Sequence, residues 1–104
     1  MDLKIIALTP QYAAAQLTFA ADDPCCREHF PGFPVLPGSV AAAAMLHLAQ
    51  SMNPETSWAI QRLRCLRFAP PGAYEIHVCR TAHGLSGSMA PVGSTSVVVQ
   101  AQLQ

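Results

Sequence analysis

The chain has 104 residues, a length that suits one small domain and is too short for two separate hydrophobic cores. Hydrophobic residues make up 51% of it and charged residues only 12%, which excludes intrinsic disorder and favours a self-associating subunit. Six basic residues balance six acidic ones, so the chain lacks the positive charge that binding to a nucleic-acid backbone requires.

No segment has the pattern of a membrane span or a secretion signal. The longest apolar stretch starts at Val40 and is interrupted at His47 and Gln50, far short of the ~20 apolar residues that a membrane-spanning helix needs. The first four residues carry one lysine, and no cleavage site follows an apolar core. We therefore expect a cytoplasmic protein without a membrane span.

The cysteines show neither a disulfide framework nor a metal site. They stand at Cys25, Cys26, Cys65 and Cys79, with no repeated interval between them. Cys26 and His29 have the spacing of a zinc-ligand pair, but no second pair accompanies them. We expect reduced thiols and no bound metal.

The N-terminal part of the chain is predicted to form two strands, over residues 3–8 and 12–20. They are separated near Pro10, and the second alternates outward and inward positions from Tyr12 to Phe19. This pattern predicts a hairpin-like opening.

A long loop is predicted over residues 21–38. It contains four of the nine prolines and two glycines, which exclude a helix or an interior strand. Its apolar residues Phe30, Phe33, Val35 and Leu36 argue against disorder in this segment. Loops of this length in a compact domain are usually functional, so we expect this one to pack on the domain and to carry the chemistry.

One helix is predicted over residues 39–52. It follows Pro37-Gly38, ends before Asn53-Pro54, and has Ser39 as its expected N-cap. Almost all of its residues are apolar or small, and the four consecutive alanines 41–44 allow another backbone to approach closely. This composition predicts a buried helix wrapped by a sheet.

The remainder is predicted to form four strands in an antiparallel meander, with Cys65 and Cys79 as small core residues within them. The expected strands are 57–68, 73–82, 85–90 and 95–103. Together with the hairpin and the buried helix, they predict an α+β domain spanning residues 1–104, with one curved antiparallel sheet wrapped around a central helix. This arrangement is the hotdog fold.

The loop carries the most specific motif. Residues 29–38 read HFPGFPVLPG, and this segment resembles the His-Phe-x-Gly-x-Pro-Val-x-Pro-Gly loop of the 3-hydroxyacyl-(acyl carrier protein) dehydratases of the FabA/FabZ type. The short chain is most similar to the dehydratase-like proteins of aryl-polyene pathways. The resemblance implies a substrate carried as a thioester on acyl carrier protein or coenzyme A, no cofactor, and a homodimer or a heterodimer with another hotdog subunit.

Eliminating water from a 3-hydroxyacyl thioester needs a base for the C2 proton and an acid for the leaving hydroxyl. A histidine, with an ordinary pKa of about 6.5, is suited to the first task at neutral pH. The resemblance implies His29 as this residue, the Gly38 amide as the donor to the thioester carbonyl, and the Val35 carbonyl as the group that orients the imidazole.

The helix departs from the family pattern at one position. The family has an Asp or Glu fourteen residues after the histidine, where this chain has Ala43, so the acid position is vacant. His47 lies one helical turn further on the same face and is the candidate substitute, although a histidine on an apolar helix is more often a core residue. Asp23 and Glu28 flank the loop and are weaker candidates.

Three functions are consistent with an alanine at the acid position. The chain is either an active dehydratase or a non-catalytic, complementing subunit whose partner supplies the carboxylate; a hotdog thioesterase is a third interpretation.

One expected strand carries three of the six basic residues, Arg62, Arg64 and Arg67. They either face an acidic carrier protein or form an ordinary solvated surface.

Overall fold

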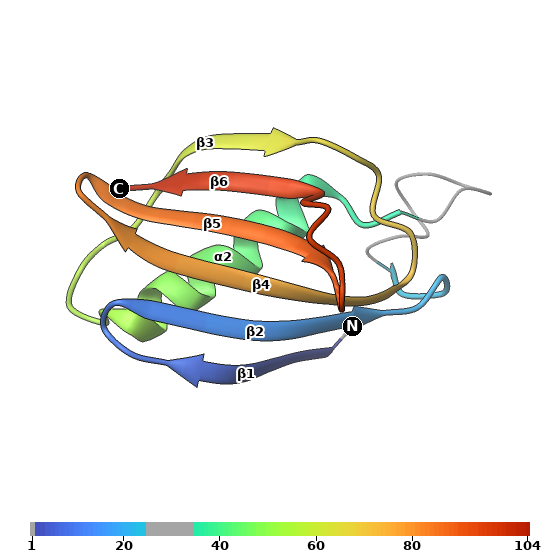
Figure 1. The fold of residues 1–104 in the computed structure, drawn as a ribbon, viewed down its shortest axis with the longest axis horizontal. Coiled ribbons are helices and arrows are strands. Elements are labelled where there is room, and N and C mark those ends of the chain that lie inside the picture. The colour runs from blue at the N-terminus through green and yellow to red at the C-terminus, as the bar shows by residue number, and fades with distance from the viewer. Residues whose placement is uncertain (1, 25–34) are drawn as a thin grey trace.

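The computed structural model describes residues 2–24 and 35–104 and shows an α+β architecture of six strands and one long helix (Figure 1). The predicted helix and the opening hairpin are confirmed to within a residue or two of their expected bounds. The elements are β1 (Asp2–Leu8), β2 (Tyr12–Phe19), α2 (Gly38–Met52), β3 (Ile60–Cys65), β4 (Gly72–Thr81), β5 (Gly84–Pro91) and β6 (Val99–Leu103).

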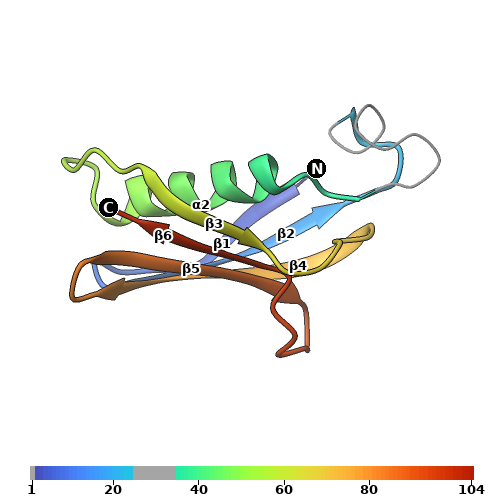
Figure 2. The same ribbon diagram turned by 90° about the horizontal axis from the view of Figure 1, so that it is seen from above.

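All six strands form one antiparallel sheet in the order β1-β2-β4-β5-β6-β3, and α2 lies along its concave face (Figure 2). The predicted meander is wrong at one strand, because β3 pairs with β6 and not with β4. β4 is already paired along its length with β2 on one side and β5 on the other, so β3 has a place only at the edge. Both β3 and β6 are shorter than expected.

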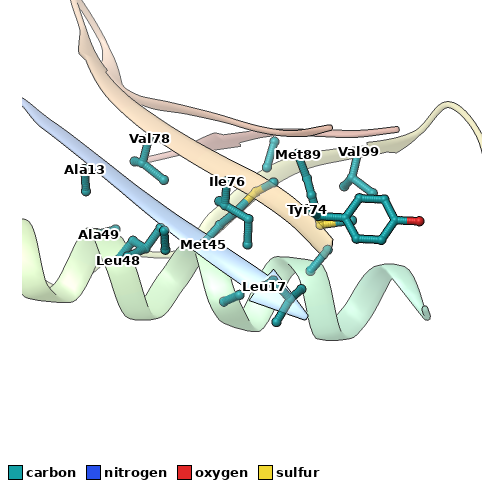
Figure 3. Packing of buried hydrophobic residues seen from close by; sticks show 14 of the residues in the cluster. Ala13, Leu17, Met45, Leu48, Ala49, Tyr74, Ile76, Val78, Met89 and Val99 are labelled. Carbon is teal, nitrogen blue, oxygen red and sulfur yellow. The ribbon is translucent and has the colours of Figure 1, made fainter. Parts of the chain in front are cut away.

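The core fills the space between α2 and the inner face of the sheet (Figure 3). Alternate strand residues such as Leu17, Ile76 and Met89 point toward the helix, which contributes Met45 and Leu48, and all five are almost completely buried. α2 comes very close to β5 at Gly87, where an added Cβ would lie 2.8 Å from the Met45 sulfur. A side chain at position 87 would press against the flexible Met45 side chain, which would have to shift.

The outer face of the sheet carries polar side chains. The Tyr12 hydroxyl on β2 lies 2.6 Å from Nδ1 of His77 on β4, and the other ring nitrogen of His77 lies 3.6 Å from the Glu75 carboxylate. Within the described residues, no helix is long and apolar enough to cross a membrane.

Candidate functional site

Among the described residues, no side chain caps the start of α2. Pro37 occupies the N-cap in an extended conformation, and its carbonyl accepts hydrogen bonds from the N–H groups of Val40 (3.1 Å) and Ala41 (3.4 Å). The prediction of Ser39 as the cap is wrong, since the helix begins one residue earlier. The N–H groups of Gly38 and Ser39 have no acceptor among the described residues, as is usual in the first turn of a helix.

A hollow of about 300 Å³ lies beside this end of the helix. It is formed where residues 35–39 pass close to the segment that follows β3, and the two are joined by a hydrogen bond from the Leu36 N–H to the Ala69 carbonyl (2.8 Å). Its walls are largely apolar. The lining residues are Val35, Leu36, Pro37, Gly38, Ser39, Cys65, Arg67, Phe68, Ala69 and Val99. We call it the helix-start hollow.

Gly38 lets the helix start approach β3. A Cβ at this position would lie 2.6 Å from the sulfur of Cys65 and 3.6 Å from a methyl carbon of Leu63. The prediction of Cys65 and Cys79 as core residues is wrong, because both are exposed. Cys65 lies on an edge strand and lines the helix-start hollow, whereas Cys79 lies on the outer face of β4.

A second hollow, of about 380 Å³, lies where α2 faces β1 and β2. Ala43 and His47 both line it and are exposed, one helical turn apart, as their spacing predicted. The other lining residues are Leu3, Leu17, Ser39, Val40 and Ala44. We call it the helix-side hollow. Of the residues named, only Ser39 lines both hollows.

The two hollows contain little charge. Among residues 2–24 and 35–104, Arg67 is the one charged side chain that lines the helix-start hollow, and no carboxylate lines either hollow. The Asp23 carboxylate instead accepts a hydrogen bond from the Ala20 N–H (2.7 Å). Within residues 2–24 and 35–104, no group of three or more His, Cys, Asp or Glu side chains is placed to hold a metal ion.

The sequence matches one known protein family over most of its length. A family model described as ApeI-like, ApeI dehydratase, matches residues 6–76, more than half of the chain. The chain belongs to the ApeI-like dehydratase family. The resemblance to dehydratases that the loop motif suggested is thereby confirmed. No functionally curated protein matches the sequence.

Solved structures similar to this ApeI-like protein include dehydratases and thioesterases. A dehydratase heterocomplex, ApeI:P from Xenorhabdus doucetiae, matches with a TM-score of 0.75 at 20% identity, covering 100% of this chain and 93% of that one. Thioesterase superfamily member 2 from Mus musculus matches with a TM-score of 0.73 at 11% identity, covering 98% and 80%. These similarities establish the hotdog fold that the sequence predicted.

In this ApeI-like protein the predicted site residues that the structure describes lie in two hollows. Val35 and Gly38 line the helix-start hollow, and Ala43 and His47 line the helix-side hollow. His29 lies outside the described residues.

Sequence analysis did not assign Cys65, Phe68 or Ala69 to the site, although all three line the helix-start hollow. Their one signal in the sequence was the Pro70-Pro71-Gly72 turn that follows them directly.

Proposed function

We propose that this ApeI-like protein eliminates water from 3-hydroxyacyl thioesters in fatty-acid, polyketide or aryl-polyene synthesis. The observation that carries the proposal is the largely apolar hollow at the start of α2, which is lined by the last four residues of the motif, 35–38. An apolar hollow fits an acyl thioester, and free amides at its wall fit the thioester oxygen. The thioester is carried on acyl carrier protein or coenzyme A.

The chemistry follows from these groups. His29 takes the C2 proton, and the electron pair of that C–H bond moves toward the thioester carbonyl, whose oxygen becomes more negative. The Gly38 N–H donates to this oxygen, helped by the positive end of the α2 dipole, and one such donor is worth about 10²–10³-fold in rate. The C2–C3 double bond then forms as the C3 hydroxyl leaves with a proton from an acid.

Within one chain, the reaction also needs a group that protonates the leaving hydroxyl. Ala43 cannot donate a proton, and His47 is the one titratable side chain among the described residues that line the helix-side hollow. We propose His47 as the acid. General-acid assistance is commonly worth about 10²–10⁴-fold, so its removal gives a measurable loss.

A second candidate function is that of a complementing subunit, and the absence of any described carboxylate from both hollows favours it. In this case a partner chain supplies the acid. The similar structure from Xenorhabdus doucetiae is itself a dehydratase heterocomplex, which supports this form of assembly.

Turnover of a 3-hydroxyacyl-carrier substrate by the purified protein tests both candidates, with the enoyl thioester and the free thiol followed by mass spectrometry. Under the first, the protein is active alone and His29→Ala abolishes activity. Under the second, activity appears only with a second hotdog protein. Free thiol without the enoyl product would show a thioesterase instead.

Restoring the carboxylate tests the vacancy directly. Ala43→Glu should raise turnover, whereas Ala42→Glu, at the neighbouring position outside both hollows, should not. If the unmodified protein is already fast and Ala43→Glu abolishes its activity, the account of the missing acid is wrong.

A further inference from the structure

Two arginines lie side by side on the outer face of β3, the face that is turned away from α2 (Figure 2). Leu63, between them in the chain, points the other way, because one of its methyl carbons lies 3.6 Å from where a Cβ at position 38 would be, at the start of α2. Successive strand residues alternate between the two faces, so Arg62 and Arg64 share the outer one, with Cβ atoms roughly 7 Å apart. Their charges are therefore adjacent and repel each other.

The neighbouring strand places a glutamine opposite each arginine. In the pairing of β3 with β6, Gln102 lies opposite Arg62 and Gln100 lies opposite Arg64. Directly opposed side chains of an antiparallel pair have Cβ atoms about 4.5–5.5 Å apart. The four side chains therefore form the corners of a small rectangle, and together with Ala101 they line a pocket of about 90 Å³. We call it the outer-face pocket.

No carboxylate of the described residues neutralises the outer-face pocket. Among residues 2–24 and 35–104, neither arginine forms an ion pair, and the side chains of the two arginines and two glutamines have no hydrogen-bond partner. On the same face of the sheet, Glu75 lies on β4, with β6 and β5 between it and β3, and its carboxylate is 3.6 Å from Nε2 of His77. The pocket therefore has two positive charges and many free N–H donors.

We infer that the outer-face pocket binds a phosphate group, either free inorganic phosphate or the phosphate of a small monoester. A guanidinium presents its donors as a planar fork that fits two oxygens of a phosphate, and a glutamine amide adds two further N–H groups. A phosphate carries nearly twice the charge of a carboxylate and more acceptor oxygens, which matches two arginines and two amides.

The size of the pocket also selects a compact ion. Its volume of about 90 Å³ is roughly three times the ~30 Å³ that a water molecule occupies in the liquid. Pockets for larger organic ligands commonly measure about 300–1,000 Å³. The chain as a whole has six basic and six acidic residues, so it offers no extended positive surface for a polyanion. One phosphate group is therefore the ligand that fits both the charge and the volume.

The outer-face pocket is separate from the proposed dehydratase site. The sheet lies between the pocket and α2, whose start and side form the two hollows (Figure 2). Arg67, the next arginine in the chain, lines the helix-start hollow and not this pocket. The inference therefore adds a second ligand site and does not rest on the proposed function.

Isothermal titration calorimetry with inorganic phosphate, at an ionic strength held constant with sodium chloride, tests the inference. A hydrogen bond to a charged group changes an equilibrium constant by about 10- to 100-fold, so two arginine contacts should give saturable binding with a Kd of roughly 0.1–10 mM. Arg62→Gln and Arg64→Gln should each weaken binding by about ten-fold or more. Arg64→Lys keeps the charge but loses the planar fork, and it should also weaken binding. Glycerol 3-phosphate distinguishes the two sources, since a pocket for monoesters binds it as tightly as inorganic phosphate and a pocket for the free ion does not.

Matched variants separate this pocket from a general charge effect and from the other arginine. Lys4→Gln removes an equal charge from β1, at the opposite edge of the sheet, and should leave the Kd unchanged. Arg67→Gln should leave it unchanged as well. Gln100→Glu places a carboxylate opposite Arg64 and should abolish binding, whereas Gln16→Glu makes the same charge change on β2 and should not.

Backbone amide signals in the NMR spectrum of the full chain locate the ligand and show that each variant is folded. Phosphate should shift the signals of β3 and β6 and leave those at the start of α2 in place. If a glutamine variant does not fold, Arg64→Lys still provides the comparison. Three results would overturn the inference: no saturable binding up to about 50 mM phosphate, a Kd that no exchange at Arg62 or Arg64 alters, or binding that only Arg67→Gln removes. Inactivity of the protein toward thioesters would leave these binding measurements unaffected.

Discussion

The close packing of α2 on β5 makes Gly87→Ala a sensitive test of the core. The new Cβ would lie 2.8 Å from the Met45 sulfur and 3.3 Å from its Cγ, inside the 3.4–4 Å of ordinary contacts. Overpacking of a core costs about 1–3 kcal/mol, while replacing a strand glycine with alanine returns about 0.5–1 kcal/mol. Because the Met45 side chain is flexible and can shift, we expect a net loss of at most about 2 kcal/mol in the free energy of unfolding.

Urea unfolding at a fixed protein concentration measures this loss, because association contributes to the stability of an oligomer. Met45→Ala alone should lower the free energy of unfolding by about 2–5 kcal/mol relative to the unmodified protein. In this background Gly87→Ala should become stabilising, because its methyl group enters the space that the Met45 side chain has left. Ser88→Ala, on the outer face of the same strand, is the control and should change stability by less than about 0.5 kcal/mol. Equal losses from Gly87→Ala in both backgrounds would refute the reasoning.

Two further predictions concern the rest of the sheet. Gly84→Ala should cost about 2–4 kcal/mol of unfolding free energy, because its Cβ would lie 2.2 Å from the Leu103 carbonyl oxygen; Gly72→Ala, at a similar positive φ with nothing within 4 Å, should cost clearly less. Tyr74→Phe should lose about 0.5–1.5 kcal/mol at neutral pH, since the hydroxyl donates to the Pro70 carbonyl. Burial raises the pKa of Tyr74, so the native state keeps the hydroxyl proton to a higher pH than the unfolded chain does. The stability advantage of tyrosine over phenylalanine should therefore shrink as the pH rises above 10.0. Unfolding measured as a function of pH checks this.

Local patterns predicted the elements of this fold well, because each depends on residues close together in the chain. The alternation in β2 and the run of small and apolar residues in α2 were sufficient to locate both to within a residue or two. The place of β3 was not predictable in this way. It depends on which neighbours β4 pairs with, and those pairings join residues far apart in the sequence.

The candidate site was predictable only in part for the same reason. The spacing of Ala43 and His47 by one helical turn predicted that they share a face of the helix, and both line the helix-side hollow. The contribution of Cys65 and Arg67 to the other hollow comes from a segment thirty residues beyond the loop, which folds back beside it. Ser39 was misassigned as a cap because Pro37, which has no side-chain acceptor, is not among the residue types preferred at that position.

Ser39 forms part of the wall of both hollows, so they are not independent compartments. A molecule that presses against its short side chain from one side alters the width available on the other. A bulkier residue at this position would narrow both spaces together.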